Sequence, residues 1–364
     1  MTTLHKTVDT STLELAYYEW GAGDRSVLLL HGFPEDAASW DKVGERLAAQ
    51  GYHAYAPYLR GFGPTRFLDA DTPRSGQLAA LTNDVLEFAD ALGLDTFTLV
   101  GHDWGARAAQ AVSALYPERV EHLVSFTDYE LAWDEAGFPP HEVLHALWYQ
   151  WVLLSEMGEP LLRGDAKGFC KYLWKVWSPT WAGSQKAFET AASSFDNPDF
   201  VEVVLSAYRY GRAPDAVSDP ELDKLEQKLA EGPNITVPTT LLIGKDDGIV
   251  RSWKGDERWR ARFTGKASRQ LLEGVGHFPQ REHPEAVIRA VTRSLEEVSA
   301  RGEPPAVALD MPSFPERREN LGAGITPCWS TRAPKCSAMA SASLPSVPPV
   351  TTAQERRKTR FTRT

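Results

Sequence analysis

The feature that most constrains the fold is a corner between an apolar run and an Ala-rich run, FTLVGHDWGARAAQ at residues 97–110. A strand that enters a helix through Gly-x-X-x-Gly forces the middle residue into a strained backbone and projects its side chain above the sheet. Here Gly101 and Gly105 flank Asp103. The start of a helix favours a negative group at this place, so Asp103 could equally be a helix cap. Other parts of the sequence must decide between a cap and a reactive carboxylate.

Short apolar runs alternate with amphipathic runs through much of the chain. The predicted strands are residues 26–30, 53–57, 97–100, 120–126, 239–244 and 269–273, and helical patterns cover 40–51 and 77–94. This alternation is typical of a parallel sheet covered by helices on both faces. Residues 5–20 read as a hairpin that adds an antiparallel edge. The sequence therefore predicts an α/β fold.

The alternation stops between residues 129 and 234. That stretch is helical in pattern and rich in tryptophan, with residues Trp133, Trp148, Trp151, Trp174, Trp177 and Trp181. An insertion of helices between two strands of one sheet would cover the carboxyl ends of the strands, where open α/β sheets bind ligands. We therefore predict a core of residues 1–128 and 235–300 with a helical cap at 129–234. Residues 301–364 contain nine prolines and no sustained apolar period, which predicts a disordered tail.

Composition limits the classes of function. The 364 residues carry a net charge of −10, which does not suggest a nucleic-acid surface. No apolar run approaches the roughly 20 residues that cross a bilayer, and the start of the chain has no signal-peptide pattern. Three cysteines without CxxC spacing favour free thiols in the cytoplasm over a disulfide frame or a metal site. We expect neither a metal nor an organic cofactor, and the sequence leaves the oligomeric state open.

Two further motifs follow predicted strands and carry groups that can act on Asp103. LLEGVGHF places His277 in a loop after the last strand, and LLIGKDDG places two acids after the strand before it. The order nucleophile, acid, histidine is that of a hydrolytic triad on this kind of sheet. Asp247 is the favoured acid because it directly precedes the turn at Gly248, and Asp246 is the alternative.

The loop after residues 26–30 reads His-Gly-Phe-Pro. This architecture places a backbone N–H here, from Phe33, which together with the N–H of Trp104 would form an oxyanion hole.

A carboxylate is ionised at neutral pH and suits displacement at a saturated carbon with a reactive leaving group, such as an epoxide or a carbon–halogen bond. The product would be an ester whose carbonyl belongs to Asp103. Water activated by His277, with Asp247 orienting the imidazole, would then cleave that ester. Opening an epoxide also needs a proton donor of high pKa opposite the nucleophile, and tyrosine meets that need.

At this point the sequence resembles the soluble epoxide hydrolases of the α/β-hydrolase fold, over about residues 1–300. The core motifs are HGFPE at 31–35, GHDWGA at 101–106 and GHF at 276–278, and the cap motifs are Tyr149-Gln150 and Tyr208-Arg209. The resemblance implies a mostly parallel sheet flanked by helices with an inserted cap, and a small apolar epoxide and water as reactants. It also implies that Tyr149 and Tyr208 hold the epoxide oxygen. We further expect a substrate pocket lined by His31, Pro34, Trp148, Trp151 and Phe278.

The main alternative is a haloalkane or haloacid dehalogenase with the same nucleophile. Trp104 could donate its indole N–H to a halide, but the haloalkane branch commonly has Asn where this chain has Phe33. The haloacetate branch usually has Arg at the position of Trp104, although Arg107 matches its second arginine. The other alternative is an inactive homologue that only binds a small ligand. Against it, every expected catalytic position holds a chemically competent residue.

Overall fold

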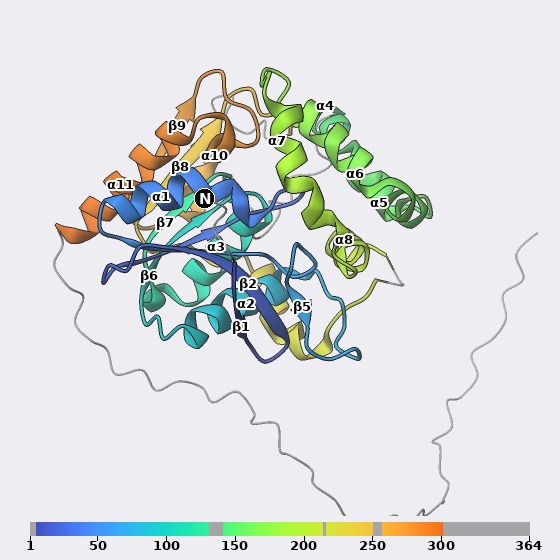
Figure 1. Ribbon diagram of the computed structural model, residues 1–364, viewed down its shortest axis with the longest axis horizontal. Coiled ribbons are helices and arrows are strands. Elements are labelled where there is room, and N and C mark those ends of the chain that lie inside the picture. Colours follow the sequence, from blue (N-terminus) through green and yellow to red (C-terminus); the bar gives the residue numbers. More distant parts are fainter. Residues whose placement is uncertain (1–4, 130, 132–140, 214–215, 250–256, 301–364) are drawn as a thin grey trace, which may run out of the picture. The chain divides into compact units, whose positions relative to one another are not determined.

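The computed structural model describes residues 5–129, 131, 141–213, 216–249 and 257–300 (Figure 1). All of them belong to one compact unit, Met1–Pro305. The predicted disordered tail, Trp133 of the predicted cap, and two of the three cysteines, Cys328 and Cys336, lie outside the described residues.

One mixed sheet forms the centre of this unit. Its strands are β1 (Lys6–Asp9), β2 (Leu13–Trp20), β3 (Ser26–Leu30), β4 (His53–Pro57), β5 (Arg66–Phe67), β6 (Phe97–Gly101), β7 (Val120–Ser125), β8 (Thr239–Gly244) and β9 (Ala267–Leu272). The strand order is β1-β2-β4-β3-β6-β7-β8-β9, with β5 paired to β2. All pairs from β4 to β9 are parallel, and β1 and β2 form the predicted antiparallel hairpin. The predicted mostly parallel α/β fold is confirmed.

Helices cover both faces of the sheet. The α-helices are α1 (Asp41–Ala49), α2 (Leu78–Ala91), α3 (Trp104–Leu115), α4 (His141–Ala146), α5 (Trp148–Leu154), α6 (Gly158–Trp177), α7 (Ser184–Ala191), α8 (Phe200–Arg209), α9 (Asp223–Ala230), α10 (Pro279–Glu282) and α11 (Pro284–Ser299). Short 3-10 helices are η1 (Ala37–Trp40), η2 (Pro117–Arg119), η3 (Ala192–Asp196), η4 (Pro220–Leu222) and η5 (Glu257–Arg262). Helices α1 and α11 pack together on one face, and α2 and α3 pack together on the other. Because both faces are covered, every residue of β6 is buried, which explains its continuous apolar run.

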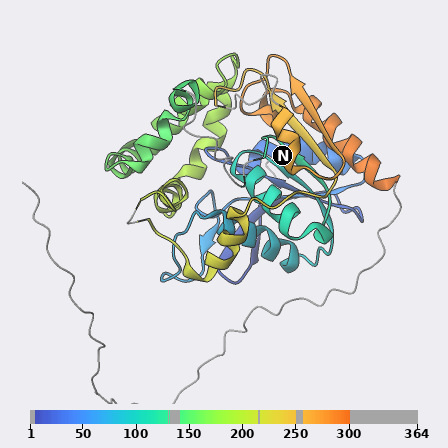
Figure 2. The ribbon, with the colours of Figure 1, turned by 180° about the vertical axis from the view of Figure 1, so that it is seen from behind.

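The helices from α4 to α9 fall between β7 and β8. Helices α5 to α8 pack against one another and lie together at one side of the sheet in both views (Figures 1 and 2). Helix α9 instead packs against α2, where Glu226 accepts a hydrogen bond of 2.7 Å from the N–H of Ala79. The division into core and cap at residues 129 and 234 stays a prediction. Among the described helices, none combines the length and the apolar character that a bilayer crossing requires.

The parallel strands bring four separate loops to one edge. Strands β3, β6, β8 and β9 run in the same direction, so the residues after them meet at the carboxyl edge of the sheet. Phe33, Asp103, Asp247 and His277 each follow one of these strands. The common strand direction therefore brings residues more than 240 positions apart to one edge.

Gly105 permits a close approach between two of these loops. A Cβ at this position would lie 2.4 Å from the carbonyl oxygen of His31 and 2.5 Å from that of Leu30. Gly105→Ala is therefore expected to lower the free energy of unfolding by about 1–3 kcal/mol, because backbone must move to admit the methyl group. Urea denaturation measures this change.

Gly164→Ala is the matched control, because Gly164 is also helical and an added Cβ meets no atom within 4 Å. It should change stability by less than about 1 kcal/mol. An equal decrease in the free energy of unfolding in the two variants would contradict the tight contact at Gly105.

Candidate active site

Asp103 occupies the corner between β6 and α3. Its φ is +51° and its ψ is −119°, and it is the one non-glycine residue with positive φ in the described part of the chain. Gly101 also allows a close approach, since a Cβ there would lie 2.5 Å from the carbonyl oxygen of Gly105. The strained corner projects the carboxyl group beyond the end of β6. The side chain of Asp103 is 15% exposed.

The Asp103 carboxylate is held by backbone donors. Its Oδ1 accepts a hydrogen bond of 2.8 Å from the N–H of Phe33. Burial raises the pKa of Asp103, but the facing His277 and the N–H of Trp104 outweigh burial, so the pKa lies below its usual value. Phe33 and Trp104, the two predicted oxyanion-hole residues, thus both act on this carboxyl group.

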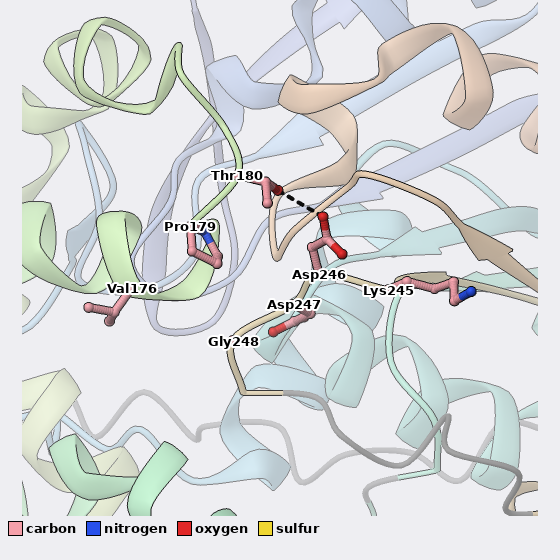
Figure 3. Close-up of a pocket in the computed structure, with 7 residues that line it drawn as sticks. All are labelled: Val176, Pro179, Thr180, Lys245, Asp246, Asp247 and Gly248. Atoms are coloured by element: carbon pink, nitrogen blue, oxygen red, sulfur yellow. Dashed lines mark hydrogen bonds between the residues drawn. The ribbon is translucent and has the colours of Figure 1, made fainter.

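His277 lies between two carboxylates. Its Nδ1 is 2.8 Å from Oδ2 of Asp247, and its Nε2 is 3.6 Å from Oδ2 of Asp103, too far for a hydrogen bond. Burial lowers the pKa of His277, but the charges of the two carboxylates outweigh burial and raise it above the usual range. Within the described residues Nε2 has no hydrogen-bond partner, so a reacting water could bind it. Asp246, the alternative acid, accepts instead from the hydroxyl of Thr180 at 3.0 Å (Figure 3).

Tyr149 and Tyr208 come from different helices, α5 and α8, and meet beside the corner. Their rings are 5.6 Å apart and perpendicular, and their exposed fractions are only 3% and 8%. The ring of Trp104 lies 5.7 Å from that of Tyr208. Burial, Tyr149 and the charge of Asp103 all raise the pKa of Tyr208 well above its usual value, so its hydroxyl keeps its proton. The amide of Gln150 donates to the hydroxyl of Tyr149 at 3.2 Å.

Two residues predicted to line the pocket have other contacts. The Nε2 of His31 accepts from the N–H of Leu59 at 2.9 Å, so Nδ1 carries the proton that it donates to the carbonyl of Gly32 at 3.0 Å. Burial lowers the pKa of His31 to about 4, so the ring is neutral, and its two hydrogen bonds fix the loop. Trp151 is 48% exposed, and its indole donates to the carbonyl of Leu144 at 3.4 Å. Contact of these two residues with a substrate stays a prediction.

The other three residues expected in the pocket are packed in aromatic surroundings. The carbonyl of Pro34 accepts from the indole of Trp174 at 2.6 Å, and Phe278 stacks on Trp174 with 4.4 Å between rings. Trp148 packs edge-on against Phe169 of α6. Their contact with a substrate stays a prediction.

Trp177 is a site residue that sequence reasoning did not single out. Its ring contacts Tyr149 with 4.9 Å between centroids and His277 with 4.8 Å, so it joins the tyrosine pair to the histidine. The tryptophan-rich composition of the predicted cap was the one sequence signal that pointed to Trp177. Composition does not distinguish Trp177 from the other tryptophans of that segment.

A surface pocket of about 270 Å³ adjoins the loop after β8 (Figure 3). It is lined by Val176, Pro179, Thr180, Lys245, Asp246, Asp247 and Gly248. Neither Asp103 nor either tyrosine contributes to it, so it is not the space in which a bond to Asp103 would form. Across the described ranges, no group of three or more His, Cys, Asp or Glu side chains is arranged to bind a metal ion.

Comparisons with known proteins agree with this geometry. The family described as alpha/beta hydrolase fold matches residues 25–284. The crystal structure of a candidate epoxide hydrolase from Klebsiella pneumoniae superposes with a TM-score of 0.75 at 38% sequence identity, covering 80% of this chain and 96% of that chain.

Curated relatives carry similar names. Epoxide hydrolase 2 of Siraitia grosvenorii is 40% identical over 124 residues, which are 34% of this chain and 38% of that protein. Epoxide hydrolase A of Mycobacterium tuberculosis is 25% identical over 324 residues, 79% of this chain and 96% of that protein. The chain thus spans 38% of the length of the Siraitia relative and nearly all of the mycobacterial one.

The contacts of the two adjacent acids predict different effects on His277. Asp247→Asn should lower the pKa of His277 by roughly 1–3 pH units, because it removes a negative charge that stabilises the imidazolium. Asp246→Asn should leave this pKa near the wild-type value, because Asp246 contacts Thr180. An NMR titration of the imidazole protons measures both, and an equal fall in the two variants would contradict the assignment of Asp247.

Proposed function

The chain belongs to the α/β-hydrolase fold family, and we propose that it is an epoxide hydrolase that opens small apolar epoxides to vicinal diols through an ester on Asp103. The observation that carries the proposal is the pair of buried tyrosines beside an ionised, backbone-held carboxylate. The named relatives support the same activity.

In the first step Oδ2 of Asp103 attacks a ring carbon of the epoxide. Oδ1 is held by Phe33, which leaves Oδ2 as the attacking oxygen. The ring carbon–oxygen bond breaks, its electron pair moves to the oxygen, and Tyr149 or Tyr208 gives that oxygen a proton. A protonated phenol matters here because an epoxide oxygen leaves poorly as an anion.

In the second step water attacks Cγ of Asp103 while Nε2 of His277 takes its proton. The N–H groups of Phe33 and Trp104 stabilise the negative charge that develops on Oδ1. The bond between Cγ and Oδ2 then breaks, and the diol leaves with Oδ2. The two protons of the water end on the leaving alcohol and on the tyrosinate, which restores the enzyme.

Ester formation itself prepares His277 to act as the base. The charge of Asp103 helps to raise the pKa of His277 in the resting enzyme. Alkylation neutralises that charge, so the pKa of His277 falls and the imidazolium can release its proton to solvent, from which it regains one when Asp103 is ionised again. The charge of Asp103 thus keeps His277 protonated until Asp103 has been alkylated.

The tyrosine pair favours epoxides over halides. A halide leaves without a proton and prefers N–H donors, whereas two phenolic hydroxyls supply the proton that an epoxide oxygen needs. The haloacid alternative rests on Arg107, which forms no salt bridge within the described part of the chain and is therefore available to a carboxylate. Against this alternative, Trp104 stands where the haloacetate branch usually has its other arginine. An inactive binding protein would not need the Asp247–His277–Asp103 alignment.

We also propose that the protein is cytoplasmic. The support is the sequence composition and a buried free thiol at Cys170, whose pKa burial raises, as suits an unreactive core residue.

The tyrosine pair gives the most direct test of substrate class. Tyr149→Phe combined with Tyr208→Phe should slow diol release from styrene oxide by roughly 10²–10⁴-fold, because no phenol remains to protonate the oxygen. Tyr210→Phe is the matched control and should keep the wild-type rate, since Tyr210 follows α8 outside the pair.

Halide release from 1-chlorobutane is measured in parallel. A double variant that still opens styrene oxide at the wild-type rate would contradict the proposed acid. Halide release that exceeds diol release in the wild type would favour the dehalogenase instead.

A further inference from the structure

The end of α6 reaches two loops that carry the proposed triad. The carbonyl of Trp177 accepts a hydrogen bond of 2.9 Å from the N–H of Gly248, one residue after Asp247. The hydroxyl of Ser178 accepts one of 2.8 Å from the N–H of His277. Two consecutive residues of the predicted cap thus hold the acid loop and the histidine loop together.

Glu282 completes this arrangement from α10. Its Oε1 accepts from the hydroxyl of Ser178 at 2.6 Å and from the N–H of Phe278 at 2.9 Å. Its Oε2 accepts from the N–H of Gly276 at 2.8 Å. Ser178 and Glu282 therefore fix the N–H groups of three successive residues, Gly276 to Phe278. We call Trp177, Ser178 and Glu282 together the clasp.

Two glycines show how closely the loops approach α6. A Cβ at Gly276 would lie 2.5 Å from Oγ of Ser178, and a Cβ at Gly248 would lie 2.2 Å from the carbonyl oxygen of Val176. Any side chain at either position would push its loop away from the helix. The contact is also dry, because Ser178 is 1% exposed.

We propose that the clasp positions His277 for ester hydrolysis, so that Ser178 and Glu282 are positioning residues for the second step. This inference rests on the proposed function. No hydrogen bond joins Ser178 to Asp103 or to either tyrosine within the described residues. Loss of the Ser178 hydroxyl would thus affect the base without removing the nucleophile or the acids.

Through the clasp, the position of α6 in the predicted cap affects the position of His277, the residue proposed to activate water. Ser178 ends α6, and moving α6 away from the sheet would break its bonds to the histidine loop. Imidazole placement depends on the backbone of residues 276–278, and a displacement of about 1 Å costs up to roughly 100-fold in rate.

The test separates the two chemical steps. Wild-type and variant enzymes are mixed with excess styrene oxide, quenched at intervals, and analysed by intact mass for the ester on Asp103. Ser178→Ala should accumulate the ester, with hydrolysis slowed roughly 10- to 100-fold and alkylation changed less than about twofold. His277→Gln, which lacks the base, marks full accumulation.

Ser194→Ala is the matched control. Ser194 is also a buried serine of the inserted segment, and its hydroxyl donates to Oδ2 of Asp36 at 2.8 Å. Within the described residues it forms no hydrogen bond with residues 276–278 or with Glu282. It should keep the wild-type ratio of the two rates. Glu282→Gln is the second variant: it keeps the side-chain shape but replaces one acceptor oxygen with an NH₂ group, and it should shift the ratio in the same direction as Ser178→Ala.

Thermal unfolding shows that each variant is folded before its rates are compared. A wild-type ratio in both Ser178→Ala and Glu282→Gln, or equal ester accumulation in Ser194→Ala, would overturn the inference. A different result would overturn the proposed function itself: the wild-type enzyme releases diol, but no ester forms in any variant, including His277→Gln.

Discussion

The strained backbone at Asp103 is the constraint on which the site depends. A non-glycine residue with φ of +51° persists only where its surroundings hold it, at a cost of order 1–3 kcal/mol. Here Gly105 lies against the carbonyls of β3, and a Cβ at Gly32 would collide with Cβ of Asp103 at 2.4 Å. This packing turns the carboxyl group toward the N–H of Phe33. The same packing thus holds the proposed nucleophile against the proposed oxyanion donor Phe33.

The proposed chemistry also needs an anion and a neutral acid side by side. Backbone donors and His277 keep Asp103 ionised despite burial. Tyr208 is surrounded by the rings of Phe33, Trp104 and Tyr149, and burial beside a negative charge keeps it protonated. The same buried space therefore shifts the two pKa values in opposite directions. At Asp103 the donors and the imidazole outweigh burial, whereas at Tyr208 burial and the nearby negative charge outweigh the hydrogen bond from Trp104.

Several features could be read from the sequence because they are local. Strands 26–30, 53–57 and 239–244 have the predicted limits, since strands buried on both faces are continuous apolar runs. Strand β5 was not predicted, because its two residues form no apolar run. The clasp could not be predicted either, because Trp177 and Ser178 meet loops that are 70 or more positions away in sequence. The partners of the His31 ring nitrogens could not be predicted, because the motif gives the loop but not its contacts.

The central claim is that a covalent bond forms and breaks at the side chain of Asp103. Its most direct test is a single turnover in H₂¹⁸O with enzyme in excess over epoxide, followed by mass analysis of the diol and of the peptide that contains Asp103. The account predicts ¹⁸O in the Asp103 carboxylate and an unlabelled diol from this first cycle. Label in the diol with none in Asp103 would mean direct attack by water and would contradict the account.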